Sequence, residues 1–164
     1  IVGDNKAIID ALNGRAKAGK KLQYSWNDID SIQKHWQTQP SGHKIAIHKK
    51  REFNKEADSF ANDAMDKEDF EEWNNDTVEK IKEEMHYGKE TTITVHFDGG
   101  KRTSHKAAVG CFIFWKSKEN WILRMGKKND DANSYEAEEP AAHEAIIKLH
   151  ETYTKTYSFK PENP

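Results

Sequence analysis

The hydrophobic pattern of the second half of the chain predicts three strands followed by one long helix. Apolar and polar side chains alternate over residues 93–97, which is the period-two pattern of a strand with one buried face. The nearly continuous apolar segment 109–115 and the segment 121–125 predict two further strands, and the short polar connections are typical of antiparallel hairpins. Apolar residues then recur at helical spacing over 137–153, where Pro140 is compatible with a helix only in its first turn.

The first half of the chain predicts mostly helices. Its segments are, in order, a two-residue strand stub at 1–2, helices at 5–12 and 27–39, a strand at 44–47, and helices at 54–65 and 67–86. The last helix is strongly acidic and is predicted from the spacing of Phe70, Trp73, Thr77, Ile81 and Met85. Asn54 is expected to cap the helix that follows it.

The order of the two halves is unusual, because a strand of two residues at the start of the chain is too short to fill a sheet position well. If the second half is read before the first, the predicted order becomes β-β-β-α-β-α-α-β-α, and the Pro-containing tail leads directly into the strand stub. We therefore expect a single domain over 1–164, in which a helical connector at 66–92 links the segments 1–65 and 93–164.

Composition narrows the class of protein. The chain has 164 residues, the size of one ordinary domain, with 35% hydrophobic and 33% charged residues. A net charge of -2 argues against a generally basic surface, so phosphate contacts must come from local patches. Cys111 is the only cysteine and lies in an apolar segment, which predicts a buried thiol without a disulfide and favours a reducing, intracellular compartment. No apolar segment approaches the roughly 20 residues that span a bilayer, so no membrane partner is expected.

Four short motifs carry a resemblance to a known family. They are Phe97-Asp98-Gly99-Gly100 at a strand end, Ala137-Glu138 followed by Ala141 and Ala142, Val2-Gly3-Asp4-Asn5 before a helix, and His48 followed by Arg51-Glu52-Phe53-Asn54 and Ala57-Asp58. In the rotated order, the chain resembles the ribonuclease H family, type 1, over nearly its whole length apart from the linking helix. The fourth motif is the most specific, because its His, Asn and Asp all fall at the family's spacing.

The resemblance implies an α/β fold, with an RNase H-like five-stranded mixed sheet flanked by helices. Because the two halves are out of the family's order, two arrangements stay open. In the first, the chain is circularly permuted, which costs little because the ends of a domain usually lie close together. In the second, the halves belong to neighbouring tandem copies or exchange segments in a domain-swapped dimer.

The resemblance also implies a metal centre built from four carboxylates. They are Asp98 and Asp4, which follow neighbouring strands, Glu138 in a first helical turn, and Asp58 on another helix. Such ligands suit two Mg²⁺ ions, with Mn²⁺ as the alternative ion, because hard cations prefer oxygen. Glu136 stays open as the alternative to Glu138. Without metal, these carboxylates repel one another, and the pKa of at least one of them is expected to rise.

The implied function is hydrolysis of the RNA strand of an RNA/DNA hybrid by a two-metal endoribonuclease mechanism. His48 resembles the family's mobile histidine, which is assigned to proton transfer or product release. The candidate substrate contacts are Lys101, Arg102, Asn5 and Arg51.

Two departures from the family keep an alternative function open. The segment 101–108 contains no glycine where the family has a glycine-rich turn, and Ser134-Tyr135 stands where the family has paired asparagines. Those positions normally help to hold the RNA strand. The alternative is a catalytically idle RNase H-like module that serves a structural or RNA-binding role in a larger assembly.

Overall fold

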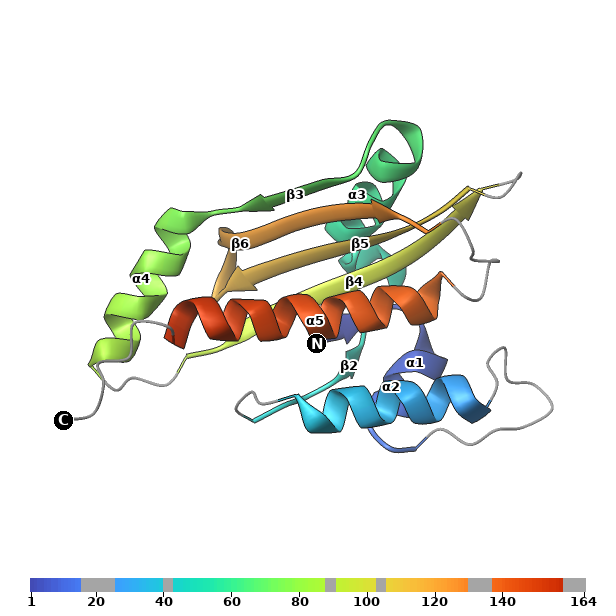
Figure 1. Ribbon diagram of the computed structural model, residues 1–164, viewed down its shortest axis with the longest axis horizontal. Helices are drawn as coiled ribbons and strands as arrows, with labels where there is room; N and C mark the ends of the chain where they lie inside the picture. The colour runs from blue at the N-terminus through green and yellow to red at the C-terminus, as the bar shows by residue number, and fades with distance from the viewer. Residues whose placement is uncertain (16–25, 40–42, 88–90, 103–105, 130–136, 158–164) are drawn as a thin grey trace.

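A mixed sheet of six strands forms the centre of the computed structural model, which describes residues 1–15, 26–39, 43–87, 91–102, 106–129 and 137–157 (Figure 1). The strands are β1 (Val2–Gly3), β2 (Ile47–His48), β3 (Phe70–Trp73), β4 (Ile93–Arg102), β5 (Lys106–Trp115) and β6 (Ser117–Lys128). The flanking helices are α1 (Lys6–Leu12), α2 (Trp26–Thr38), α3 (Lys55–Asp66), α4 (Asn75–His86) and α5 (Glu138–Tyr157), with a 3₁₀ turn η1 (Arg51–Phe53) before α3.

The strand order is β2-β1-β4-β5-β6-β3. Strands β4, β5 and β6 form the antiparallel meander that the alternating pattern predicts. Strand β1 lies between β2 and β4 and is parallel to both, with Val2 opposite Ile47 on one side and His96 on the other. The two-residue stub therefore does occupy a position inside the sheet, where it brings the two halves of the chain together.

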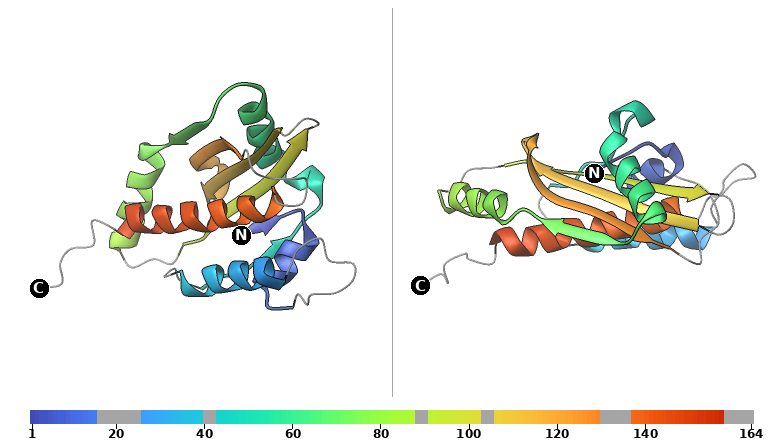
Figure 2. Two further views of the ribbon diagram at one scale, coloured as in Figure 1. Left: turned by 45° about the vertical axis from the view of Figure 1, so that its right-hand side comes forward. Right: turned by 90° about the horizontal axis from the view of Figure 1, so that it is seen from above.

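Helices cover both faces of the sheet. Figure 2 shows α3 on one side and α2 and α5 on the other, and both α1 and α2 contact α5. The approach of α3 is close, because a Cβ atom on Gly110 of β5 would lie 2.0 Å from the carbonyl oxygen of Ala57. Only glycine leaves room for the helix backbone at this point.

The core follows from the apolar faces of the strands. Residues 107–115 of β5 are all buried, as their nearly continuous apolar character predicts for a strand covered on both faces. On the α5 side, Phe97 and Ile113 belong to the same cluster as Ile146. Cys111 is buried there as a free thiol, as predicted, and burial raises its pKa.

Two predictions about the connector and the sheet are wrong. Residues 67–86 do not form one helix, and the sheet has six strands rather than five, because Phe70–Trp73 forms β3. Phe70 and Trp73 have a spacing that fits a helix, but two side chains cannot exclude a strand. The open edge of β6 decides the conformation, since it pairs with β3 and places Phe70 opposite Gly126.

The strand predicted at 44–47 is also shifted, to Ile47–His48. Its partner β1 has only two residues, and the ladder ends where the Lys49 N–H donates to the Gly3 carbonyl. None of the helices within the described ranges combines the length and the apolar character that crossing a membrane requires.

Candidate metal centre

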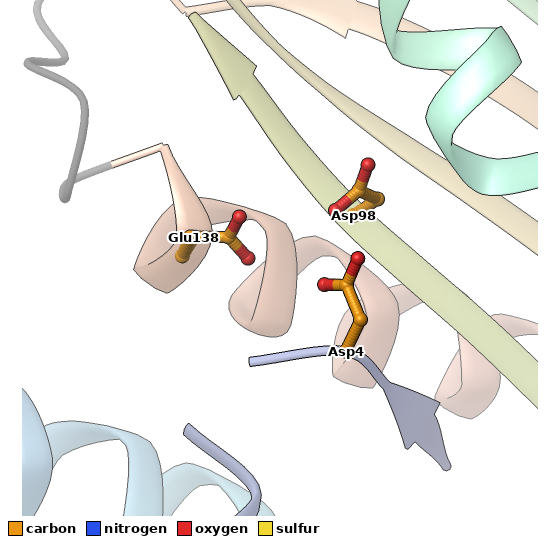
Figure 3. A group of neighbouring side chains, drawn as sticks. All are labelled: Asp4, Asp98 and Glu138. Atoms are coloured by element: carbon orange, nitrogen blue, oxygen red, sulfur yellow. The ribbon is translucent and has the colours of Figure 1, made fainter. Parts of the chain in front are cut away.

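Three carboxylates from three different elements meet at one end of the sheet. Asp4 directly follows β1, Asp98 lies in β4, and Glu138 is the first residue of α5. Because Gly3 is paired with Phe97, the next residues of these two parallel strands, Asp4 and Asp98, come side by side. One oxygen from each of the three carboxylates lies within 4.8 Å of the other two, and Figure 3 shows the side chains pointing toward one another.

Two glycines allow this convergence. A Cβ atom on Gly3 would lie 2.7 Å from the ring of Phe97, so a larger residue would push β1 away from β4. A Cβ atom on Gly99 would lie 2.2 Å from the carbonyl oxygen of Ala137, at the point where α5 begins. Gly99 therefore lets the first turn of α5 rest directly on β4, and its backbone N–H also donates a hydrogen bond to the Glu138 carboxylate.

Burial and mutual repulsion make these groups reluctant to ionise together. Asp98 is only 4% exposed. Burial, followed by the negative charges of Glu138 and Asp4, raises the pKa of Asp98 to about 10. Burial and the charge of Asp4 raise the pKa of Glu138 to about 8, and burial also raises the pKa of Asp4. The rise predicted from the sequence is therefore found at all three carboxylates.

One oxygen of the cluster has no hydrogen-bond partner within the described part of the chain. The Oε2 atom of Glu138 is buried, and no described residue donates to it. A buried acceptor without a donor costs about 1–3 kcal/mol, and more when it is charged. A hard divalent cation, which binds carboxylate oxygens, would satisfy this atom and offset the repulsion in the same step. The donor set therefore fits Mg²⁺ or Mn²⁺.

Asp58, the fourth predicted ligand, lies at the margin of the cluster. It forms a hydrogen bond with Asp98, so it is adjacent to the other carboxylates. Its two oxygens are also engaged elsewhere, since Oδ1 lies 3.6 Å from Arg51 and Oδ2 accepts a 3.5 Å hydrogen bond from Asn62. The three carboxylates whose oxygens all lie within 4.8 Å of one another do not include Asp58.

The predicted cap by Asn54 is wrong, and the reason concerns the site. Asn54 occupies the N-cap position of α3 but makes no side-chain cap hydrogen bond. Its Nδ2 donates to the Phe97 carbonyl at 2.8 Å, and its Oδ1 lies 3.2 Å from His96 Nδ1. Because Oδ1 can only accept, His96 carries its proton on Nδ1. Asn54 thus joins the start of α3 to β4, one residue before Asp98.

His96 is a structural residue that the sequence reading missed. Burial, with a smaller contribution from the charge of Lys118, lowers the pKa of His96 to about 4, so its imidazole is neutral at pH 7. The alternation of the strand could have placed His96 on the face of β4 opposite to Val95 and Phe97. Asn54 contacts His96 on that face.

The other predicted site residues lie around the edge of the carboxylate cluster or apart from it. His48 is exposed, and its Nε2 lies 3.2 Å from the carbonyl oxygen of Asp4. Arg51 is exposed and pairs with Asp58. Asn5 caps α1 by accepting a 3.1 Å hydrogen bond from Ile8 N, and Lys101 is exposed on β4, three residues beyond Asp98. The side chain of Arg102 and the whole of Glu136 lie outside the described part of the chain.

Comparisons with protein-family models, with curated proteins and with solved structures found no match.

Proposed function

We propose that the chain is a metal-dependent endoribonuclease of ribonuclease H type that hydrolyses the RNA strand of RNA/DNA hybrids. The observation that carries the proposal is the convergence of Asp4, Asp98 and Glu138, with a buried glutamate oxygen to which none of the described residues donates. An arrangement with such an electrostatic cost is unfavourable in a purely structural role, and a bound cation explains it.

The order of the elements supports a circularly permuted RNase H-like fold. Starting at β4, the elements run β4-β5-β6-α5, and the first half of the chain continues with β1-α1-α2-β2-α3. This is the order that the motifs imply once the halves are exchanged.

In this proposal, the residues divide the work of phosphodiester hydrolysis. Asp4, Asp98 and Glu138 would hold the divalent ions, which supply an activated water and neutralise charge on the leaving oxygen when bound. Asp58, beside Asp98, would orient the ligands or complete the set. His48 lies next to Asp4 at the exposed edge, where its imidazole can accept or donate a proton.

The positions of the basic and acidic side chains favour binding of a nucleic-acid backbone near the start of α5. Exposed Lys101 lies on β4, which carries Asp98, and exposed Arg51 lies on η1, directly before the helix that carries Asp58. Both side chains can contact phosphates there. The acidic helix α4 lies beside the C-terminal half of α5 (Figure 1). Because α5 has 20 residues, about 30 Å in length, α4 lies far from Glu138 and does not oppose a polyanion there.

The test is cleavage of an end-labelled RNA/DNA hybrid in Mg²⁺ and in Mn²⁺. The wild type and an Asp63→Asn control, which changes an exposed aspartate of α3, are expected to cut the RNA strand. Asp98→Asn is expected to reduce the rate by at least about 10³-fold, because a buried ligand is lost. If the hybrid is bound but no protein cuts it, the idle-module alternative replaces the enzyme. Equal cleavage by Asp98→Asn would contradict the assigned centre.

A further inference from the structure

A second group of metal-binding side chains lies where α2 crosses α5. The Nδ1 atoms of His35 and His143 are 2.8 Å apart, and the two rings are stacked with centroids 5.1 Å apart and an interplanar angle of 23°. His143 follows Glu138 by five residues, which at 3.6 residues per turn places the two side chains about 140° apart around α5. The histidine pair is therefore separate from the carboxylate cluster.

The close contact of the two nitrogens defines which atoms carry protons. Two Nδ1 atoms at hydrogen-bond distance require one donor and one acceptor, because a neutral imidazole has one of each. The Nε2 atom of His143 lies 3.6 Å from Glu139 Oε1, and this carboxylate favours a proton on Nε2. The lone pair of His143 Nδ1 is then directed at His35.

This arrangement resembles the way in which metal-binding histidines are held in general. A ligating imidazole commonly directs its other ring nitrogen at a carboxylate, which selects the tautomer and orients the ring. Burial lowers the pKa of His143, and the charge of His35 adds to this effect. Burial also lowers the pKa of His35. Both rings are therefore neutral at pH 7, and the neutral imidazole is the form that binds metal.

We propose that His35 and His143 bind a divalent transition-metal ion of the Zn²⁺ class and thereby clamp α2 onto α5. Two nitrogen ligands at about 2.0–2.1 Å from a tetrahedral Zn²⁺ lie about 3.4 Å apart, so the two Nδ1 atoms, now 2.8 Å apart, need to separate by only about 0.6 Å. Binding also moves the proton of His35 from Nδ1 to Nε2, which leaves a lone pair on each Nδ1 for the metal. Both side chains are partly exposed, which leaves room for water as the remaining ligands. The carboxylates of Asp28 and Glu144 also act on His143 and add negative potential.

The chemistry of the ligands separates this site from the carboxylate cluster. Imidazole nitrogens select Zn²⁺, Ni²⁺ or Cu²⁺, whereas an all-oxygen set suits Mg²⁺ or Mn²⁺. An ion that binds the folded chain and not the unfolded chain also stabilises the fold. Zn²⁺ is therefore expected to raise the melting temperature through the histidine pair, whether or not the protein cuts a hybrid.

The test is calorimetric titration of Zn²⁺ into the whole chain in saturating Mg²⁺. The wild type is expected to bind one equivalent at the histidine pair, with affinity weakened at least about tenfold in His143→Gln and in His35→Gln. The matched control His43→Gln changes an exposed histidine outside the pair and is expected to keep the affinity. Asp98→Asn is expected to keep this binding too, because it alters only the carboxylate cluster.

Thermal melting gives a second readout and shows that each variant is folded. Zn²⁺ is expected to raise the melting temperature of the wild type and of His43→Gln, and to leave that of the folded His35→Gln and His143→Gln variants unchanged. If either folded variant retains wild-type affinity, or if Asp98→Asn loses binding to the same degree, the histidine site is wrong.

Discussion

At the scale of single residues, Asp98 is a carboxylic acid placed where its charged form is unfavourable. Burial and the neighbouring carboxylates raise its pKa to about 10, compared with about 3.9 in an unfolded chain. Between these values the folded state binds more protons than the unfolded state. The free energy of unfolding therefore falls as the pH rises through this window.

This sign leads to a stability prediction for Asp98→Asn. In a chelating buffer at neutral to mildly alkaline pH, the free energy of unfolding of the variant is expected to exceed that of the wild type by about 1 kcal/mol or more. Each kcal/mol raises the melting temperature by about 2–4 °C in a protein of this size. The gain should shrink as the pH falls toward about 4 and vanish below it, where the wild-type carboxylate becomes protonated in the unfolded state as well. Thermal melts across this pH range check it, with Asp63→Asn as the control. A variant less stable than the wild type at alkaline pH would contradict the electrostatic account.

Asn54 shows where residue-level prediction from the sequence stops. Its position before a helix predicts a cap, and the local sequence contains nothing that indicates a partner on β4. The observed partners, the Phe97 carbonyl and the His96 ring, are more than forty residues away along the chain. The three carboxylates that do meet, Asp4, Asp98 and Glu138, could in contrast be named from their motifs, because each motif is local.

We predict that Asn54→Ala lowers the free energy of unfolding by about 2–4 kcal/mol, because it leaves two buried polar groups unpaired. The matched control is Asn74→Ala, since Asn74 is also an N-cap residue without a side-chain cap bond. The control should change stability by less than about 1 kcal/mol. Chemical denaturation of both variants provides the comparison, and equal losses would show that Asn54 acts only as a helix terminus.

At the scale of elements, β3 is the part that the sequence could not predict. Phe70–Trp73 lacks a clear period, and its conformation depends on pairing with β6, which lies some fifty residues later in the chain. The meander β4-β5-β6 and helix α5 were predictable, because alternation and helical spacing act over neighbouring residues. β1 was predictable as a strand, although its place inside the sheet depends on pairing with both β2 and β4.

The strand conformation of β3 predicts different roles for two adjacent glutamates. Glu71 forms a 2.7 Å ion pair with Lys148 of α5 and accepts a 2.8 Å hydrogen bond from the Trp73 indole. Both glutamates are exposed, but Glu72, the next residue of the strand, points to the opposite face of the sheet. Glu71→Gln is expected to lower the free energy of unfolding by about 0.5–1 kcal/mol, since the pair is partly solvent-screened. Glu72→Gln should be neutral. Denaturation in low and high salt tests this, and a larger loss for Glu72→Gln would contradict the observed register.

At the scale of the whole molecule, the fold depends on contacts between the two halves of the chain. β1 inserts beside β4, α3 from the first half packs on the strands of the second, and α2 packs on α5. Reading the halves in exchanged order predicted that Asp4 and Asp98 would meet, and the structure brings them together with Glu138. Asp58 lies at the margin of this cluster, where it contacts Asp98 and also Arg51 and Asn62.

The most direct measurement of the central claim is an anomalous difference map from crystals of the chain soaked in Mn²⁺. We expect a peak within coordination distance, about 2.0–2.3 Å, of oxygens from Asp4, Asp98 and Glu138, and no such peak in crystals of Asp98→Asn. A map of the wild type with no peak between these three carboxylates, under conditions that saturate the protein with Mn²⁺, would contradict that claim.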